Sequence, residues 1–253
     1  MTSFDLHAGE TVADFHLLGT VPFDECIALQ RRLRYQVSSE VNRRLVVLLC
    51  EHPEIISIGR SGSRSHIRLT TAELRRRQLA VRWINRSGGC ILHAPGQLCV
   101  YPIVPLDRLQ WTASEYRQRL RAGITAALSA MGIASRRRSG SAGLWGVTGL
   151  LAAIGVGVKQ ETTCQGAYIN VAPNPMNFGF VDTAATCVEA GEKATMSCLL
   201  AERRQPVRMT AVRASAIEQL ARSFACDRYN LHTGHPWLRP QTENEHEPAA
   251  RAS

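Results

Sequence analysis

Lysine is scarce in this sequence of 253 residues. Among its 30 lysine and arginine residues, only Lys159 and Lys193 are lysines. Arginine keeps its charge under all physiological conditions, whereas lysine can lose its proton when its surroundings lower its pKa. The sequence therefore offers very few candidates for a catalytic lysine.

Paired metal-binding cysteines and long apolar runs are also missing. The eight cysteines include no Cys-x-x-Cys pair, which argues against a disulfide scaffold and a zinc knuckle. The longest aliphatic runs, residues 45–50 and 150–158, are strand-sized and too short to cross a bilayer. The first ten residues lack the pattern of a secretory signal. We expect a cytoplasmic protein with reduced thiols, no metal site and no membrane association.

The overall composition is that of an ordinary globular protein. Hydrophobic residues make up 45% and charged residues 20% of the chain, which excludes disordered and fibrous classes. The net charge of +9 favours acidic partners. The arginine runs at residues 75–77 and 136–138 have no interleaved aromatic residues, so we interpret them as solvated surface and expect no nucleic-acid partner.

The hydrophobic pattern predicts alternating helices and strands. We expect a strand buried on both faces at residues 45–50, and a helix that is capped by Thr70 or Thr71 and runs through Gln78. A longer helix is expected from an N-cap at Ser114 to a stop at Gly132. Further strands are predicted at residues 55–58, 81–84, 99–104, 150–159 and 167–171, and further helices at residues 23–37, 196–202 and 211–226.

This order of elements predicts an α/β (α+β) fold, with one mixed sheet flanked by helices. The polar residues 160–165 are expected to separate two strands, and residues 174–192 to form a long loop. We expect an N-terminal extension at residues 1–19, one catalytic domain at residues 20–230 and a polar tail at residues 231–253.

The most informative segment is residues 85–98, in which Arg86 and His93 bracket a run of small residues before a Pro-Gly turn. Glycines in such a loop allow the backbone to approach a ligand, and a histidine leaving it can orient or polarise a carbonyl group. The alternative interpretation is a tight surface loop with a fully hydrogen-bonded histidine.

Three further segments contain candidate functional residues. Residues 150–159 are expected to form a glycine-containing strand, and the segment 164–171 is expected to form another strand, at residues 167–171, after a turn. Cys187 lies in a loop ahead of the predicted helix that follows Thr195. A helix N-terminus favours a thiolate, so this cysteine is better placed for reactivity than one within a strand.

These segments, in this order, resemble the octanoyltransferases of lipoate synthesis, within the lipoate and biotin protein ligase family. Residues 86–98 resemble the signature RGGxxTYHGPGQL, and residues 51–60 resemble LEHPPxxTLGR. Residues 153–155 and 166–171 resemble the elements KIAAIG and HGxALNV.

The resemblance implies a biotin/lipoate protein ligase catalytic fold and an acyltransferase. Such enzymes move an octanoyl group from acyl carrier protein to a lysine of a lipoyl domain, on a 2-oxoacid dehydrogenase or the glycine cleavage H protein. They act through a cysteine thioester, without ATP or another cofactor, and we expect a monomer. Cys187 matches the family's cysteine. The implied substrate-binding residues are Arg86, Ser87, Gly88, Gly89, Cys90, Ile91, Leu92, His93, Ala153, Ile154, Gly155, Gly166, Ala167 and Tyr168.

The sequence departs from the family pattern at its catalytic lysine. Leu150 occupies that position, and a leucine cannot stabilise a thiolate. Gln165 replaces the histidine of HGxALNV, and Cys187 is flanked by Thr186 and Val188 in place of proline and glycine.

Three hypotheses remain open. The first is an octanoyltransferase that uses Cys187, helped by Lys159, Lys193 or the helix start near Thr195. The second is a variant acyltransferase or amidotransferase. The third is a degenerate member that binds an acyl chain or a lipoyl domain with little or no transfer. An ATP-dependent ligase is disfavoured, because its adenylate-binding lysine would also lie at Leu150.

Overall fold

The structure is a computed structural model that describes residues 9–141, 143–183 and 195–238. Its strands are β1 (Val12–Thr20), β2 (Arg44–Glu51), β3 (Ile55–Ile58), β4 (Ala80–Trp83), β5 (Cys90–His93), β6 (Gln97–Ile103), β7 (Leu144–Trp145), β8 (Leu150–Lys159), β9 (Thr162–Asn170) and β10 (Arg228–Thr233). Its α-helices are α1 (Phe23–Ser39), α2 (Thr71–Arg76), α3 (Leu106–Leu109), α4 (Ala113–Ala130), α5 (Leu199–Arg203) and α6 (Met209–Ser223). Short 3₁₀ helices span Arg64–His66 and Pro175–Gly179.

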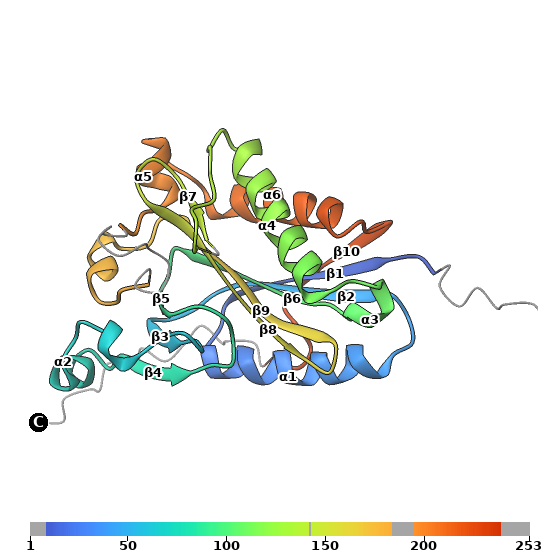
Figure 1. Ribbon diagram of the computed structural model, residues 1–253, viewed down its shortest axis with the longest axis horizontal. Coiled ribbons are helices and arrows are strands. Elements are labelled where there is room, and N and C mark those ends of the chain that lie inside the picture. Colours follow the sequence, from blue (N-terminus) through green and yellow to red (C-terminus); the bar gives the residue numbers. More distant parts are fainter. Residues whose placement is uncertain (1–8, 142, 184–194, 239–253) are drawn as a thin grey trace, which may run out of the picture.

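The main sheet has seven strands in the order β10-β1-β2-β6-β9-β8-β7. Strand β1 runs parallel to both of its neighbours, β10 and β2, and the other pairs are antiparallel. Helix α1 covers one face of this sheet, and α4 and α6 cover the other (Figure 1). The predicted mixed sheet flanked by helices is confirmed.

Strand β2 lies between the two layers of helices. Leu45, Val47 and Leu49 pack into the core under α4 and α6, whereas Val46 and Leu48 pack under α1. This alternation confirms the predicted burial of residues 45–50 on both faces, since successive side chains of a strand point to opposite sides.

A second sheet of three strands, in the order β4-β3-β5, packs against α2. The prediction of a single sheet is therefore wrong. The chain leaves the main sheet at Pro53, where a proline cannot continue a strand ladder. Ile55–Ile58 then pairs antiparallel with Cys90–His93, a segment that the sequence places in a loop.

Helix starts follow their capping boxes. The Thr70 side chain accepts a hydrogen bond from the Glu73 amide and caps α2, as predicted. Helix α4 is capped by Thr112, so the predicted cap at Ser114 is wrong. The cause is Glu115, whose carboxylate accepts the Thr112 amide at 2.7 Å while Thr112 Oγ1 accepts the Glu115 amide.

Strands β8 and β9 form a tight hairpin. Gln160 and Glu161 both have positive φ, 51° and 50°, as the two central residues of a hairpin turn require. Residues 162–165 are therefore paired in β9, and the long separating stretch predicted at 160–165 is wrong.

The sheet also takes in segments beyond the expected domain bounds. Strand β1 includes residues from the predicted N-terminal extension, and β10 continues into the predicted tail. Within the described ranges, no helix is long and apolar enough to cross a membrane.

Asp14 joins β1 to both neighbouring strands. Its carboxylate accepts hydrogen bonds from Arg44 on β2 and, at 2.9 Å and 3.3 Å, from Asn230 and His232 on β10. Burial alone raises the pKa of Asp14, but these hydrogen bonds outweigh it and lower the pKa to about 2. The ionised carboxylate therefore stabilises the folded state above the ordinary pKa of 3.8.

We expect Asp14→Asn to lower the free energy of unfolding at pH 7 by about 1–3 kcal/mol, because the hydrogen bonds to a charged group weaken. The loss should shrink as pH falls from about 4 to 2, where Asp14 itself becomes protonated. Urea unfolding across this pH range measures it. Asp24→Asn, in an exposed ion pair with Arg82, is the matched control, and an equal loss in both variants would contradict the account.

Candidate active site

The loop at residues 85–89 lies across strand β8. The Ser87 amide donates to the Val156 carbonyl at 2.9 Å, and the Val156 amide donates to Ser87 Oγ at 3.0 Å. A Cβ atom at Gly155 would lie 2.8 Å from the Ser87 carbonyl oxygen. Glycine at position 155 is therefore what allows the loop to lie on the strand.

Arg86 is fully buried at the centre of this loop. Its guanidinium donates to the carbonyls of Ser87, Gly89 and Ser57 at 3.0–3.1 Å and to Ser57 Oγ at 2.8 Å. It also lies over the Tyr168 ring, 5.6 Å from the centroid. Among the described residues no carboxylate pairs with it, and its Nε atom has no hydrogen-bond partner. The loop therefore holds a positive charge in the interior.

A chain of hydrogen bonds runs from Arg86 through His93. Ser57 Oγ lies 2.7 Å from His93 Nε2, and His93 Nδ1 lies 2.9 Å from Gln97 Oε1. Gln97 Nε2 donates to Asn170 Oδ1 at 3.0 Å. Gln97 Nε2 also donates to the Leu92 carbonyl, so Gln97 Oε1 faces His93 and accepts the proton on Nδ1. Ser57 Oγ, which accepts from Arg86, therefore donates to the unprotonated His93 Nε2.

The chain continues to the far side of the site. Asn170 Nδ2 donates to the Ser197 carbonyl at 3.0 Å. One directed series of hydrogen bonds thus connects β3, the Arg86 loop, β6, β9 and the segment before α5.

His93 has a positional role in this arrangement. It is fully buried against the rings of Phe23 and Tyr168, and burial lowers its pKa, so the ring is neutral. Both ring nitrogens are engaged in the chain. The sequence suggests that this histidine could orient or polarise a carbonyl group. Because both of its nitrogens are already hydrogen-bonded, the structure favours the orienting role.

The turn after His93 is fixed by the partly buried carboxylate of Glu51. Glu51 Oε2 accepts the Gly96 amide at 2.8 Å, and Glu51 Oε1 pairs with Arg213 at 2.7 Å. Gly96 has φ +87°, and a Cβ atom there would lie 2.5 Å from the Ala172 carbonyl oxygen, so the turn requires glycine.

Two neighbouring pockets open beside this network. The first encloses about 350 Å³, including the part open to solvent, and is lined by Arg86, Gly88, Gly89, Ile91, Ser141, Gly143, Leu150, Ala153, Ile154 and Thr183. The second encloses about 310 Å³ on the same basis and includes Leu92, Gln97, Asn170 and Met196 in its lining. Thr183 lines both, and its hydroxyl is buried without a partner among the described residues.

The first pocket brings together residues from two separate predicted segments: Arg86, Gly88, Gly89 and Ile91 from one, and Leu150, Ala153 and Ile154 from the other.

The remaining predicted residues support this pocket or lie apart from its lining. Ser87 and Gly155 hold the loop on β8, and Gly166 and Ala167 lie in the β6–β9–β8 ladder. Leu92 lines the second pocket. Cys90 donates to the Ser63 carbonyl, and burial raises the pKa of its thiol.

Leu150 lies at the segment that follows the predicted nucleophile. Its amide donates to the Thr195 carbonyl at 2.8 Å, and its carbonyl accepts the Ser197 amide at 3.0 Å. Its side chain is 2% exposed and packs against Trp145 and Met196. Cys187 itself lies outside the described residues, as does Lys193.

Of the positive groups proposed from the sequence as substitutes for the missing lysine, Lys159 and the start of α5 can be placed relative to Leu150. Lys159 is exposed at the opposite end of the ten-residue strand β8, roughly 30 Å away at about 3.3 Å per residue. Helix α5 begins only at Leu199, four residues after Thr195, and has five residues. Arg86 is the cation that lines the same pocket as Leu150 within the described ranges.

Sequence reasoning missed Ser57 and Ser197 and did not include Gln97 and Asn170 among the site residues. Gln97 and Asn170 lie within the motif segments, so the motifs could have identified them as site residues. Ser57 is the polar residue within an otherwise apolar strand, which is a weaker one. Ser197 takes part through its backbone carbonyl, so its side chain gives no indication.

Comparisons with known proteins agree with this picture. The profile of the lipoyl protein ligase A/B catalytic domain matches residues 22–221. A Geotalea uraniireducens protein named octanoyltransferase is 32% identical over 197 residues, which cover 78% of this chain and 86% of that protein. A Syntrophotalea carbinolica protein of the same name is 32% identical over 200 residues, covering 79% and 89%.

Solved structures share the fold at low sequence identity. A lipoate-protein ligase A solved with bound ATP superposes with a TM-score of 0.68 at 11% identity, covering 90% of each chain. The bi-partite lipoate protein ligase of Thermoplasma acidophilum gives 0.65 at 12% identity, covering 89% of each chain. The predicted ligase-type fold is confirmed.

We expect Ser57→Ala to lower the free energy of unfolding by about 1–3 kcal/mol, because Arg86 loses an acceptor and buried His93 Nε2 loses its donor. Denaturant unfolding measures the loss. The control is Ser129→Ala on the exposed face of α4, which should change stability little. Equal stability of the two variants would show that the hydrogen-bond chain is not a structural constraint.

Proposed function

Because the chain belongs to the lipoyl protein ligase A/B catalytic-domain family, we propose that it is an octanoyltransferase that carries an octanoyl group from acyl carrier protein to a lysine of a lipoyl domain. The observation that carries this proposal is the pocket at which Arg86, Ile91 and Leu150 meet. Its relatives named octanoyltransferase support the same reaction.

The walls of the first pocket suit contact with the hydrocarbon part of an acyl group. Ile91, Leu150, Ala153 and Ile154 give it apolar walls. Each methylene buried against such walls contributes about 0.8 kcal/mol. The polar groups at the pocket are Arg86, Ser141 and Thr183, which suits a ligand with a carbonyl at one end and hydrocarbon along its length.

The chemistry proposed at this site is two successive acyl transfers. The Cys187 thiolate attacks the thioester carbonyl of octanoyl carrier protein, and the carrier thiol leaves with the electron pair of the broken C–S bond. The amine of the acceptor lysine then attacks the octanoyl-cysteine, loses a proton and releases the Cys187 thiolate. Both steps start from a thioester, so neither needs ATP.

Arg86 supplies positive charge that the family otherwise draws from a lysine. Its guanidinium is buried among neutral acceptors without a carboxylate in the described part of the chain. A charge that is not neutralised in a poorly solvated site favours an anion nearby, here a thiolate or an oxyanion. Because a guanidinium stays protonated, Arg86 would stabilise the anion by its fixed positive charge and would not act as a proton donor.

The partners follow from this reaction. The net charge of +9 suits an acidic carrier protein as donor. The acceptors would be lipoyl domains of 2-oxoacid dehydrogenases or the glycine cleavage H protein, and the enzyme would act as a monomer.

A second candidate function is binding of an acyl chain or a lipoyl domain with little transfer. Leu150 favours it, because an apolar side chain replaces the family lysine and is buried beside Trp145 and Met196. The two candidates differ in whether an acyl-enzyme forms.

We expect the wild-type protein to form an octanoyl adduct on Cys187 when mixed with octanoyl carrier protein, and Cys187→Ala to abolish both adduct and transfer to an apo lipoyl domain. Intact-mass spectrometry and a lipoyl-domain gel-shift assay measure these outcomes. Cys226→Ala, at a half-buried cysteine of the α6 core, is the control. Absence of an adduct in the wild type would favour the binding function.

We expect Leu150→Lys to move the rising limb of the pH–rate profile to lower pH and to increase transfer at pH 7, since a nearby ammonium lowers the thiol pKa. Leu150→Met, uncharged and of similar volume, should leave the profile unchanged. A faster Leu150→Lys enzyme with an unaltered pH profile would contradict the role given to this position.

A further inference from the structure

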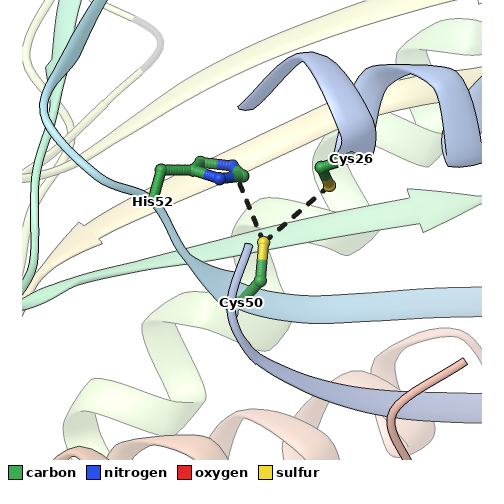
Figure 2. Close-up of side chains that lie close together, drawn as sticks. All are labelled: Cys26, Cys50 and His52. Carbon is green, nitrogen blue, oxygen red and sulfur yellow. Dashed lines mark hydrogen bonds between the residues drawn. The ribbon is translucent and has the colours of Figure 1, made fainter. Parts of the chain in front are cut away.

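A group of thiols and an imidazole lies on the α1 side of the main sheet, apart from the two pockets. Cys26 comes from α1, Cys50 from β2, and His52 follows β2 directly, and all three are fully buried (Figure 2). Their side chains point toward a common centre. Cys26 Sγ lies 3.9 Å from Cys50 Sγ, and Cys50 Sγ lies 3.6 Å from His52 Nε2.

These separations are close to those of ligands that share one metal ion. The three ligand atoms lie within 4.8 Å of one another. Zn–S bonds of about 2.3 Å and Zn–N bonds of about 2.0 Å, at tetrahedral angles, place neighbouring ligand atoms roughly 3.5–3.8 Å apart. Small side-chain adjustments would therefore bring all three atoms to a central ion.

His52 is held in the orientation that metal binding requires. Its Nδ1 donates to the Val21 carbonyl at 2.6 Å, so in the neutral ring the lone pair lies on Nε2, the nitrogen that faces Cys50. Metal-binding histidines are typically oriented in this way by a backbone carbonyl. The Tyr101 hydroxyl, 2.9 Å from Nε2, shares this lone pair and would turn aside for a metal.

Cys99 is the nearest candidate for a fourth ligand. It lies directly opposite Cys50 in the antiparallel β2–β6 register, and both side chains face the core under α1. Opposed side chains in such a pair have Cβ atoms about 4.5–5.5 Å apart. The Cys99 thiol already interacts with Cys50 and His52, and its contacts to His93 Nδ1 and Gln97 Oε1 are long, 3.8 Å each.

We propose that Cys26, Cys50, Cys99 and His52 form a closed, structural Zn²⁺ site. Three thiolates and a neutral imidazole make a tetrahedral donor set of the Cys₃His type. On binding, the three thiols release their protons to solvent as the three Zn–S bonds form, and His52 uses its existing lone pair. The surroundings, which include Leu29, Leu48 and Phe23, contain no water-accessible side and suit a structural rather than a catalytic ion.

The site would fasten α1 to β2 and β6 at one point. Strand β6 also contributes Gln97 to the hydrogen-bond chain, so the ion would stabilise the strand on which the candidate active site depends. Spacing in the sequence does not reveal this set, because its members come from three different elements.

The test measures metal in the full-length protein, expressed with added zinc and purified under reducing conditions without chelators. We expect about one zinc per chain by elemental analysis, and at least a tenfold loss in Cys26→Ala and in Cys50→Ala. Cys187→Ala and Cys226→Ala, which alter cysteines outside the set, should keep the zinc. The Cys187→Ala control also separates this proposal from the octanoyltransferase proposal, since that variant would lose transfer but keep the metal.

Measurements on the wild type keep the test independent of whether a variant folds. X-ray absorption of the zinc protein should show three sulfur ligands and one nitrogen ligand, and substitution by Co²⁺ should give thiolate-to-cobalt charge-transfer bands. Chelation should lower the thermal midpoint. Reduced wild-type protein that takes up less than about 0.1 zinc per chain would overturn the proposal. So would zinc retained by both Cys26→Ala and Cys50→Ala, or a Cys26–Cys50 disulfide in protein isolated anaerobically.

Discussion

Arg86 carries a charge into the interior of the protein, and the path of the chain around it follows from the need to surround that charge with oxygen atoms. Three of its four acceptors are backbone carbonyls, from positions 57, 87 and 89. A carbonyl can accept only if its peptide is correctly turned, so the charge dictates the shape of the loop in a way that a carboxylate partner would not. Gly155 on β8 leaves room for the loop in this shape, because a Cβ atom there would collide with the Ser87 carbonyl oxygen.

The hydrogen bonds that connect Arg86 to the Ser197 carbonyl all run in one direction. Because that carbonyl can only accept, Asn170, Gln97, His93 and Ser57 each have one permitted orientation, and Ser57 Oγ accepts from Arg86 where the series begins. This ending lies beside Leu150, whose backbone pairs with the same segment. The loop motif, the histidine and the region after position 194 are therefore parts of one connected unit.

Much of this could be predicted from local sequence, and the remainder depends on contacts between distant residues. The apolar run at 45–50 and the Thr70–Glu73 pair determine local structure directly, and both predictions are confirmed. Strand β10 is exposed along its whole length, and only Tyr229 and Leu231 give it an alternating pattern. Strand β1 contains Asp14, which is satisfied by residues 30 and 216 positions away. The motif marked His93 as important, but only the fold shows that both of its nitrogens are engaged. The three thiols near His52 likewise meet only after α1 packs on the sheet.

The position of Lys159 has a consequence for an enzyme that delivers activated acyl groups to amines. A thioester on such an enzyme can be intercepted by any neutral amine that reaches it, including those of the enzyme itself. Arginine supplies the positive surface here without offering a nucleophile, and the one lysine among the described residues lies at the opposite end of β8 from Leu150. On the proposed mechanism, a surface that carries its positive charge on arginine offers few amines that could capture the acyl group.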